Sequence, residues 1–163
     1  MHLSRDRLAL EPLDADAFAP FGTLLDLPLT GGAGRWDRVA NVQDLRGGLE
    51  TNVALIRAAA EPLPATIARL ERHPHSSQLF VPVGMAGRFL VVVAPDRGGQ
   101  PDLAQLRAFL CEGARGVVYA PGVWHHPLVS LVPCRFLMLV HEDGGAEDTL
   151  WHELATPIPL DGD

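Results

Sequence analysis

The chain has 163 residues, of which 47% are hydrophobic and 20% charged, so we expect one folded domain over residues 1–163 with a sizeable core. A formal net charge of -7 at pH 7 leaves no surplus of Lys and Arg for phosphates and argues against a nucleic-acid binder. No stretch approaches the roughly 20 apolar residues that span a bilayer, and the opening lacks the apolar core of a signal peptide. Cys111 and Cys134 are too few for a disulfide framework, which favours a reducing compartment. Together these features predict a cytoplasmic protein without membrane partners.

Short predicted strands, separated by turns, dominate the chain in sequence order. A short helix capped by Asp14 is expected first, and a second helix is predicted between Pro62 and Pro74 from the spacing of its apolar residues. The clearest predicted helix begins at Asp102 and ends near Gly113. The tail after Gly144 is acidic, and we expect it to be less ordered. The predicted strands are 23–27, 52–58, 78–83, 88–94, 116–120, 123–131 and 135–141.

The distribution of Gly and Pro along the chain favours a mainly β fold. The sequence contains 16 Gly and 14 Pro, which break it into short segments at close spacing. Such a pattern is typical of a β-barrel or sandwich rather than of an α/β fold. We therefore predict an all-β barrel or jelly roll with one or two short helices.

Two segments hold four of the seven histidines. The first contains His73 and His75, and the second runs from Tyr119 to Pro127. Ala120-Pro-Gly-Val123 suits a type II turn, because Pro presets one torsion angle and Gly adopts the positive one. On the strand that follows, alternation directs His125 to one face and His126 to the other, so one of them faces the barrel interior. Alternation alone does not say which one.

Both segments resemble the motifs of cupins, small barrels that bind metals or small ligands between their sheets. Pro121-Gly-x-Trp-His125 is similar to the second cupin motif. His73-x-His75 followed by Gln78 resembles the first, with an amide in place of the usual carboxylate. The resemblance implies a candidate metal site at His73, His75, Gln78 and His125 for Ni, Mn, Fe or Zn, with no organic cofactor. The competing interpretation is that His73 and His75 only lie in the turn around Pro74 and bind no metal.

A narrower resemblance covers nearly the whole chain. Leu13-Asp-Ala-Asp-Ala-Phe-Ala-Pro-Phe-Gly22 is similar to the opening of the ureidoglycolate lyase family. Further segments follow in the family's order, ending on its most specific motif: Ile56-Arg-Ala58, Pro62-Leu-Pro64, Leu70-Glu-Arg-His-Pro74, Ser77-Gln-Leu-Phe-Val-Pro82, Phe89-Leu-Val-Val-Val-Ala94, Pro101-Asp-Leu103, Leu106-Arg-Ala-Phe109, Gly116-Val117, Tyr119 and Val123-Trp-His-His-Pro-Leu128. The chain departs from the family at Val118, where Asn is usual, and at Ala120-Pro121, where His-Arg is usual. At His75 it carries an imidazole where the family usually has an apolar residue.

The resemblance implies a lyase that releases urea and glyoxylate from ureidoglycolate in purine and allantoin catabolism, as a homodimer. Elimination needs a base for the hydroxyl proton and an acid for the departing urea nitrogen, and His73 and His125 suit either task. Gln78 is expected to orient the ureido group, and Tyr119 to supply a weak acid. Glu71, the acid beside the histidines, is equally compatible with a structural salt bridge and with catalysis.

The substrate carboxylate requires a guanidinium, which offers paired hydrogen bonds. The candidates for binding this small-molecule substrate are Arg57, Arg72 and Arg88, which flank the barrel motifs. Two other hypotheses remain open at this point. One is a metal-dependent cupin enzyme for another small hydroxy or keto acid, and the other is a non-catalytic cupin that binds such an acid.

Overall fold

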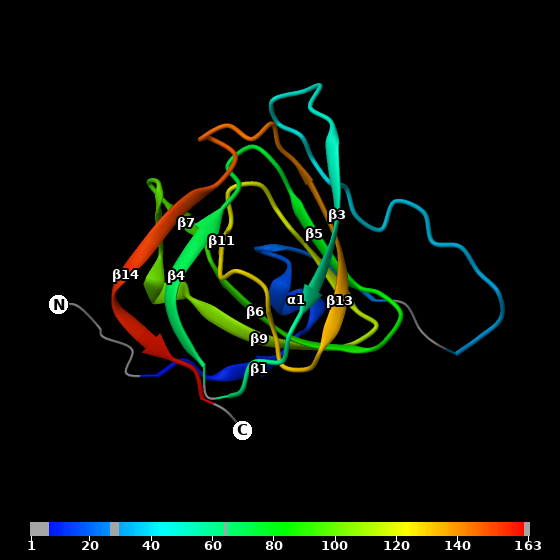
Figure 1. Cartoon of the computed structure of the whole chain (residues 1–163), viewed down its shortest axis with the longest axis horizontal. Helices are drawn as coiled ribbons and strands as arrows, with labels where there is room; N and C mark the ends of the chain where they lie inside the picture. Colours follow the sequence, from blue (N-terminus) through cyan, green and yellow to red (C-terminus); the bar gives the residue numbers. More distant parts are fainter. Residues whose placement is uncertain (1–6, 27–29, 64, 162–163) are drawn as a thin grey trace.

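Two curved β-sheets face each other and enclose an interior space (Figure 1). The structure is a computed structural model that describes residues 7–26, 30–63 and 65–161. The seven-stranded sheet has the spatial order β1 (Leu10–Pro12), β9 (Arg107–Gly113), β6 (Gly87–Ala94), β11 (Trp124–His125), β4 (Thr66–Arg72) and β14 (Leu150–Pro159), with β12 (Val129–Ser130) also paired to β6. The five-stranded sheet has the order β2 (Gly22–Leu25), β10 (Gly116–Tyr119), β5 (Gln78–Pro82), β13 (Cys134–His141) and β3 (Thr51–Ala58).

Little else in the described residues is regular. A small hairpin joins β7 (Asp96–Arg97) to β8 (Gln100–Pro101), and the helical segments are α1 (Ala15–Phe18) and the single 3₁₀ turn η1 (Leu103–Gln105). The predicted all-β, cupin-like barrel with one or two short helices is therefore confirmed. No helix in the described part of the chain is long and apolar enough to cross a membrane.

The seven-stranded sheet is buried on both faces. Its concave face packs against the five-stranded sheet through an interior core that includes Phe89, Phe109 and Phe136. Its convex face carries a second core, which includes Trp124 and Leu70 and is covered by residues near both ends of the chain. Alternate residues of one strand therefore enter different cores.

The helix predicted from Asp102 is wrong beyond its first turn. Asp102 does cap a turn, since its carboxylate accepts a hydrogen bond from the Ala104 amide, but the chain then becomes β9. Ala108 enters the convex core, and Phe109 enters the interior core. A strand buried on both faces presents an almost continuous apolar run, which imitates the spacing of a helix face.

The helix predicted between Pro62 and Pro74 is also wrong, because residues 66–72 form β4. Its apolar residues Ile67 and Leu70 both enter the convex core although they stand three apart. The partner strand β14 shifts register between Glu153 and Ile158, and this irregularity breaks strict alternation. The tail expected to be less ordered supplies that partner strand.

The remaining predicted elements need only small corrections. The Asp14-capped helix is α1, with the Asp14 carboxylate accepting from the Asp16 and Ala17 amides at 3.0 Å each. Its Phe18 is fully buried, which contributes roughly 1.5–3 kcal/mol. The strand predicted over 23–27 is β2, and its expected last residue, Leu27, lies outside the described residues. The strand predicted over 123–131 is divided into β11 and β12.

Candidate functional site

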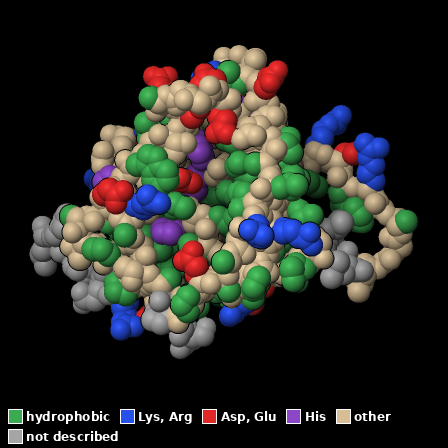
Figure 2. All heavy atoms as spheres, viewed as in Figure 1, with side chains coloured by type: hydrophobic (Ala, Val, Ile, Leu, Met, Phe, Trp, Pro, Cys, Tyr) green, Lys and Arg blue, Asp and Glu red, His purple; other side chains and the backbone are tan. Residues whose placement is uncertain are grey.

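Five polar side chains meet at one end of the space between the two sheets. Glu71 comes from β4 and His125 from β11, whereas Gln78 and Tyr119 come from β5 and β10 of the opposite sheet. His73 lies just beyond β4, and its ligand atoms, with those of Glu71 and His125, all lie within 4.8 Å of one another. Figure 2 shows histidine atoms in the hollow between the sheets.

Alternation along β4 explains why Glu71 and His73 lie together. Leu70 points into the convex core, so Glu71 on the next position points to the concave face. Glu71 is the register partner of His125 on the neighbouring strand. Because residues opposite each other in a sheet share a face, the two side chains meet inside the barrel.

The turn before β11 determines the orientation of His125. The Val123 amide donates to Ala120 O at 3.3 Å, and Gly122 has a φ of 79°, as the predicted type II turn requires. Trp124 then enters the convex core, and His125, 1% exposed, enters the interior. His126 is only partly buried, and its Nδ1 donates to Pro127 O at 2.8 Å.

The ring of His73 is held in one tautomer. Its Nδ1 lies 2.9 Å from Asp148 O, and since a carbonyl only accepts, Nδ1 carries the proton. Nε2 therefore has a lone pair in the neutral ring; it is buried and lacks a hydrogen-bond partner among the described residues. Burial and the nearby His125 lower the pKa of His73. This nitrogen is a free electron-pair donor directed at Glu71 and His125.

A second layer of contacts fixes the carbonyl that orients His73. The Asp148 carboxylate accepts from Arg46 Nη2 at 2.8 Å and from the amides of Asp143 and Gly144 at 3.0 and 2.6 Å. Arg46 also donates to His141 O at 3.2 Å. The turn that carries Asp148 is thus fastened to the loop that carries Arg46.

His125 is surrounded by acceptors. Its Nδ1 donates to Val123 O at 3.0 Å, while Nε2 faces Gln78 Oε1 at 3.0 Å and Glu71 Oε1 at 3.5 Å. Burial acts to raise the pKa of Glu71, but the hydrogen bond to His125 and the other imidazoles nearby outweigh it, so the net pKa of Glu71 is lowered. Glu71 is therefore ionised at neutral pH. The oxygen atoms of Glu71 and Gln78 both face His125 Nε2, so a proton or a cation is needed between them.

Tyr119 forms the boundary between this polar cluster and the apolar core. Its ring stacks on His125 with centroids 4.2 Å apart and planes 9° apart, and its edge meets Phe18. Burial raises the pKa of Tyr119 far above its usual range, so the phenol keeps its proton. The stack fixes the plane of the His125 imidazole.

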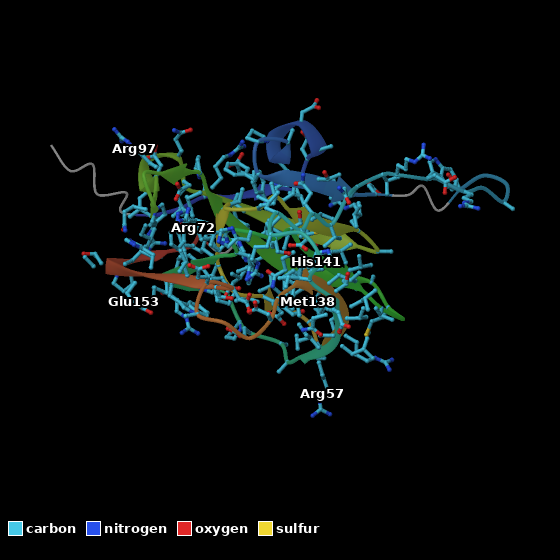
Figure 3. The ribbon with its side chains drawn as sticks, turned by 90° about the horizontal axis from the view of Figure 1, so that it is seen from above. Arg57, Arg72, Arg97, Met138, His141 and Glu153 are labelled. Atoms are coloured by element: carbon cyan, nitrogen blue, oxygen red, sulfur yellow. The ribbon has the colours of Figure 1, made fainter. Side chains whose placement is uncertain are left out.

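None of the three arginines predicted to bind substrate reaches this cluster. Arg57 is exposed on β3 and points away from the molecule in Figure 3. Arg72 pairs with Asp96 at 2.6 Å on the convex side, and Arg88 pairs with Glu112 at 3.0 Å. Arg72 also lies over the Trp124 ring, 5.0 Å from its centroid.

The predicted metal ligands are only partly brought together. His73, His125 and Gln78 converge, but His75 is not among the grouped ligand atoms, and Glu71 takes its place. The chain turns at residues 74–75, which ends the alternation that directs Glu71 and His73 inward. Alternation along a β4 strand was the signal that could have selected Glu71 from the sequence.

The donor set suits a divalent metal. Two imidazole nitrogens and a carboxylate are ligands that Ni, Mn, Fe and Zn accept. The buried Nε2 of His73, which has no protein partner among the described residues, is the atom a metal would satisfy. The cluster is therefore compatible with a bound cation held by Glu71, His73 and His125.

The fold and the site together define a class: this chain is a cupin-like β-barrel with a cluster of histidine and carboxylate side chains between its sheets. One solved structure that resembles the chain is RmlC from Streptococcus suis in complex with dTDP-D-xylose, with a TM-score of 0.40 and 17% identity. The match covers 63% of this chain and 48% of that one.

Sequence comparison gives the family. The model of the ureidoglycolate lyase family matches residues 5–160. A ureidoglycolate lyase of Pseudomonas savastanoi pv. phaseolicola is 36% identical over 96% of this chain and 99% of its own length. Those of Burkholderia cepacia and Brucella anthropi are 40% and 39% identical, over 84% and 92% of this chain and 80% and 89% of their own lengths. The chain belongs to the ureidoglycolate lyase family, which confirms the predicted family and the prediction of a lyase-type enzyme.

Proposed function

We propose that the protein is a cytoplasmic, single-domain ureidoglycolate lyase of purine and allantoin catabolism, which releases urea and glyoxylate. The observation that carries the proposal is the convergence of Glu71, His73, Gln78 and His125 inside the barrel of a chain with this family match. The cysteines, both buried free thiols, support a reducing compartment.

The chemistry needs one proton to move from oxygen to nitrogen. Ureidoglycolate loses its hydroxyl proton as the carbonyl of glyoxylate forms, and the carbon–nitrogen bond breaks with its electrons passing to the urea nitrogen. Glu71 has a lowered pKa and is ionised, so it accepts the hydroxyl proton and returns it to the departing nitrogen. One carboxylate thus acts first as the base and then as the acid, and the reaction has no net gain or loss of protons.

The other residues position these groups. Gln78, placed 3.0 Å from His125, is near enough to the cluster to hold the ureido group by its amide. Tyr119 keeps the His125 ring in plane, and Asp148 O keeps the lone pair of His73 directed inward. We propose that His73 and His125, with one oxygen of Glu71, hold a divalent metal. When bound, such a metal polarises the substrate's hydroxyl or carboxylate and lowers its proton affinity.

The test is a turnover assay with racemic ureidoglycolate, in which glyoxylate and urea are detected separately on protein of known metal content. We expect one urea for each glyoxylate, and Glu71→Gln should lower kcat by roughly 10²–10⁴-fold. Release of ammonia instead of urea would contradict a lyase. Absence of turnover in metal-loaded protein would favour another small hydroxy or keto acid as substrate.

We also propose that the protein is a homodimer that pairs through the outer face of the five-stranded sheet. Val53 and Leu55 on β3 are 62% and 79% exposed, and their register partners on β13 are Leu139 and Leu137. The exposed Val53 and Leu55 and the partly buried Leu137 and Leu139 beside them form an apolar patch of the kind that a partner covers. Leu55→Asp should shift the mass measured by light scattering from dimer to monomer; a monomeric native protein would contradict the proposal.

A further inference from the structure

The cluster contains no guanidinium or ammonium group that would hold the substrate's carboxylate. The site contains the carboxyl group of Glu71, and the chain carries a net charge of -7, so an anion approaching the site meets repulsion unless a local cation compensates. Arg72 and Arg88 are bound to Asp96 and Glu112. Arg57 lies exposed on β3, at the far edge of the other sheet. A cationic side chain that holds the carboxylate therefore has to come from another position.

Exposure increases in one direction across the concave face of the seven-stranded sheet. From β11 to β4, the exposed fraction of the side chain rises from 2% for His125 to 13% for Glu71. On β14, the next strand, Trp151 is the register partner of Glu71 and is 50% exposed. Side chains in register share a face, so His125, Glu71 and Trp151 form a row from the floor of the site to its rim.

Arg69 stands on that rim. It lies two residues before Glu71 on β4, on the same face and about 6.6 Å away along the strand. Its guanidinium carbon is 4.7 Å from the centroid of the Trp151 ring. Among the described residues no carboxylate forms an ion pair with Arg69, not even its register partner Glu153.

The Trp151 ring prepares this guanidinium for an anion. A planar guanidinium stacked on an aromatic ring keeps its N–H edges free, and the stack restricts the otherwise flexible side chain. Two parallel N–H groups match the two oxygens of a carboxylate. The distance from Arg69 to Glu71 also suits a molecule that is only a few bonds long.

We propose that Arg69, supported by Trp151, is the substrate-binding residue that holds the carboxylate of ureidoglycolate at the rim of the site. The carboxylate then lies outward, and the hydroxyl and ureido groups point inward toward Glu71 and Gln78. The identity of the anion rests on the proposed function; the anion-binding role of Arg69 rests on the geometry alone.

Steady-state kinetics with ureidoglycolate test the role. Arg69→Ala should raise KM roughly 10–100-fold with little change in kcat, because an anchor that binds substrate and transition state alike affects KM. Arg69→Lys should recover part of the loss, and Trp151→Ala should raise KM only a few-fold. The matched control is Arg97→Ala, which removes the same charge from an exposed position on β7. An unchanged KM in Arg69→Ala, or an equal rise in Arg97→Ala, would overturn the proposal.

A binding measurement separates this inference from the proposed function. Ureidoacetate has the ureido and carboxylate groups but no hydroxyl, so it cannot eliminate urea. Calorimetry should show that wild-type protein binds it and that Arg69→Ala weakens binding roughly 10–100-fold. If ureidoglycolate is not turned over but Arg69-dependent binding remains, the proposed function fails and the anion site stands. Equal binding by both proteins would overturn the anion site.

Discussion

Strand β4 carries polar side chains on both faces, and the two sets have different surroundings. On the convex side, Arg72 and Trp124 Nε1 both donate to Asp96, at 2.6 and 2.9 Å. On the concave side, Glu71 and His73 direct acceptor atoms at one another, and His73 Nε2 lacks a hydrogen-bond partner within the described chain. Arg72 Nε, like His73 Nε2, has no partner among the described residues, so the difference lies in where the groups point. The convex groups share one carboxylate of the protein, whereas the concave groups direct acceptor atoms at a common point, which suits them to receive a ligand.

The largest expected effect comes from removing an imidazole on the concave side. His125→Ala should lower kcat/KM by roughly 10²–10⁴-fold, since it removes a group at the reacting centre. The matched variant is His152→Ala, whose ring packs edge-on against Trp124 on the convex side. It should change the urea midpoint but leave kcat/KM of the folded protein unaltered. Equal kinetic losses in both variants would contradict the division between the faces.

Removing the shared acceptor on the convex side should have the opposite effect. Asp96→Ala leaves Arg72 and the Trp124 indole without their partner, so it should cost about 1–3 kcal/mol in the free energy of unfolding. Equilibrium urea denaturation measures this loss. Glu50→Ala, which removes a carboxylate from an exposed position, provides the control. A large fall in kcat/KM for folded Asp96→Ala would mean that the convex side also takes part in substrate binding.

A smaller effect is expected from the layer behind His73. Arg46→Ala frees the Asp148 carboxylate, which loosens the turn whose carbonyl orients the imidazole. Because the lone pair then points inward less often, kcat should fall about tenfold with little change in KM. Arg35→Ala removes an equal charge from an exposed loop contact with Asp37 and should leave both constants unchanged. A rise in KM alone would show that Arg46 acts on substrate binding instead.

The smallest effect concerns the apolar floor of the concave face. Burial raises the pKa of Cys111 to about 12, so this thiol remains protonated well above neutral pH. A thiol reagent at pH 8 should not label it in native protein, and labelling should appear only when urea unfolds the chain. Rapid native labelling, mapped by mass spectrometry, would indicate that the interior opens to solvent.

Sequence patterns were sufficient for the fold class but not for every strand. Gly, Pro and short apolar segments correctly predicted the barrel, the turn at Ala120–Val123 and the cap at Asp14. Strand β9 imitates a helix because both of its faces are buried. Strand β14 gives no strand signal, because its apolar residues do not alternate and only Leu154 is buried. Burial on two faces depends on which strands pair, and local spacing does not contain that information.

The same limit applies to the site. The motifs single out His73, Gln78 and His125, and the structure brings these three side chains together. The sequence does not decide the role of Glu71, because a predicted helix over residues 66–72 gives no basis for placing it beside His73. Arg69 carries no motif, and only its register with β14 shows its relation to Trp151.

The position of β4 between β11 and β14 also affects how the site folds. Residues 66–72 pair with residues 150–159, which lie far away in the sequence. The carbonyl that orients His73 belongs to Asp148, just before that strand. Closing so long a loop is slow. We therefore expect the pairing of β4 with β14, and with it the orientation of the His73 imidazole, to form late in folding.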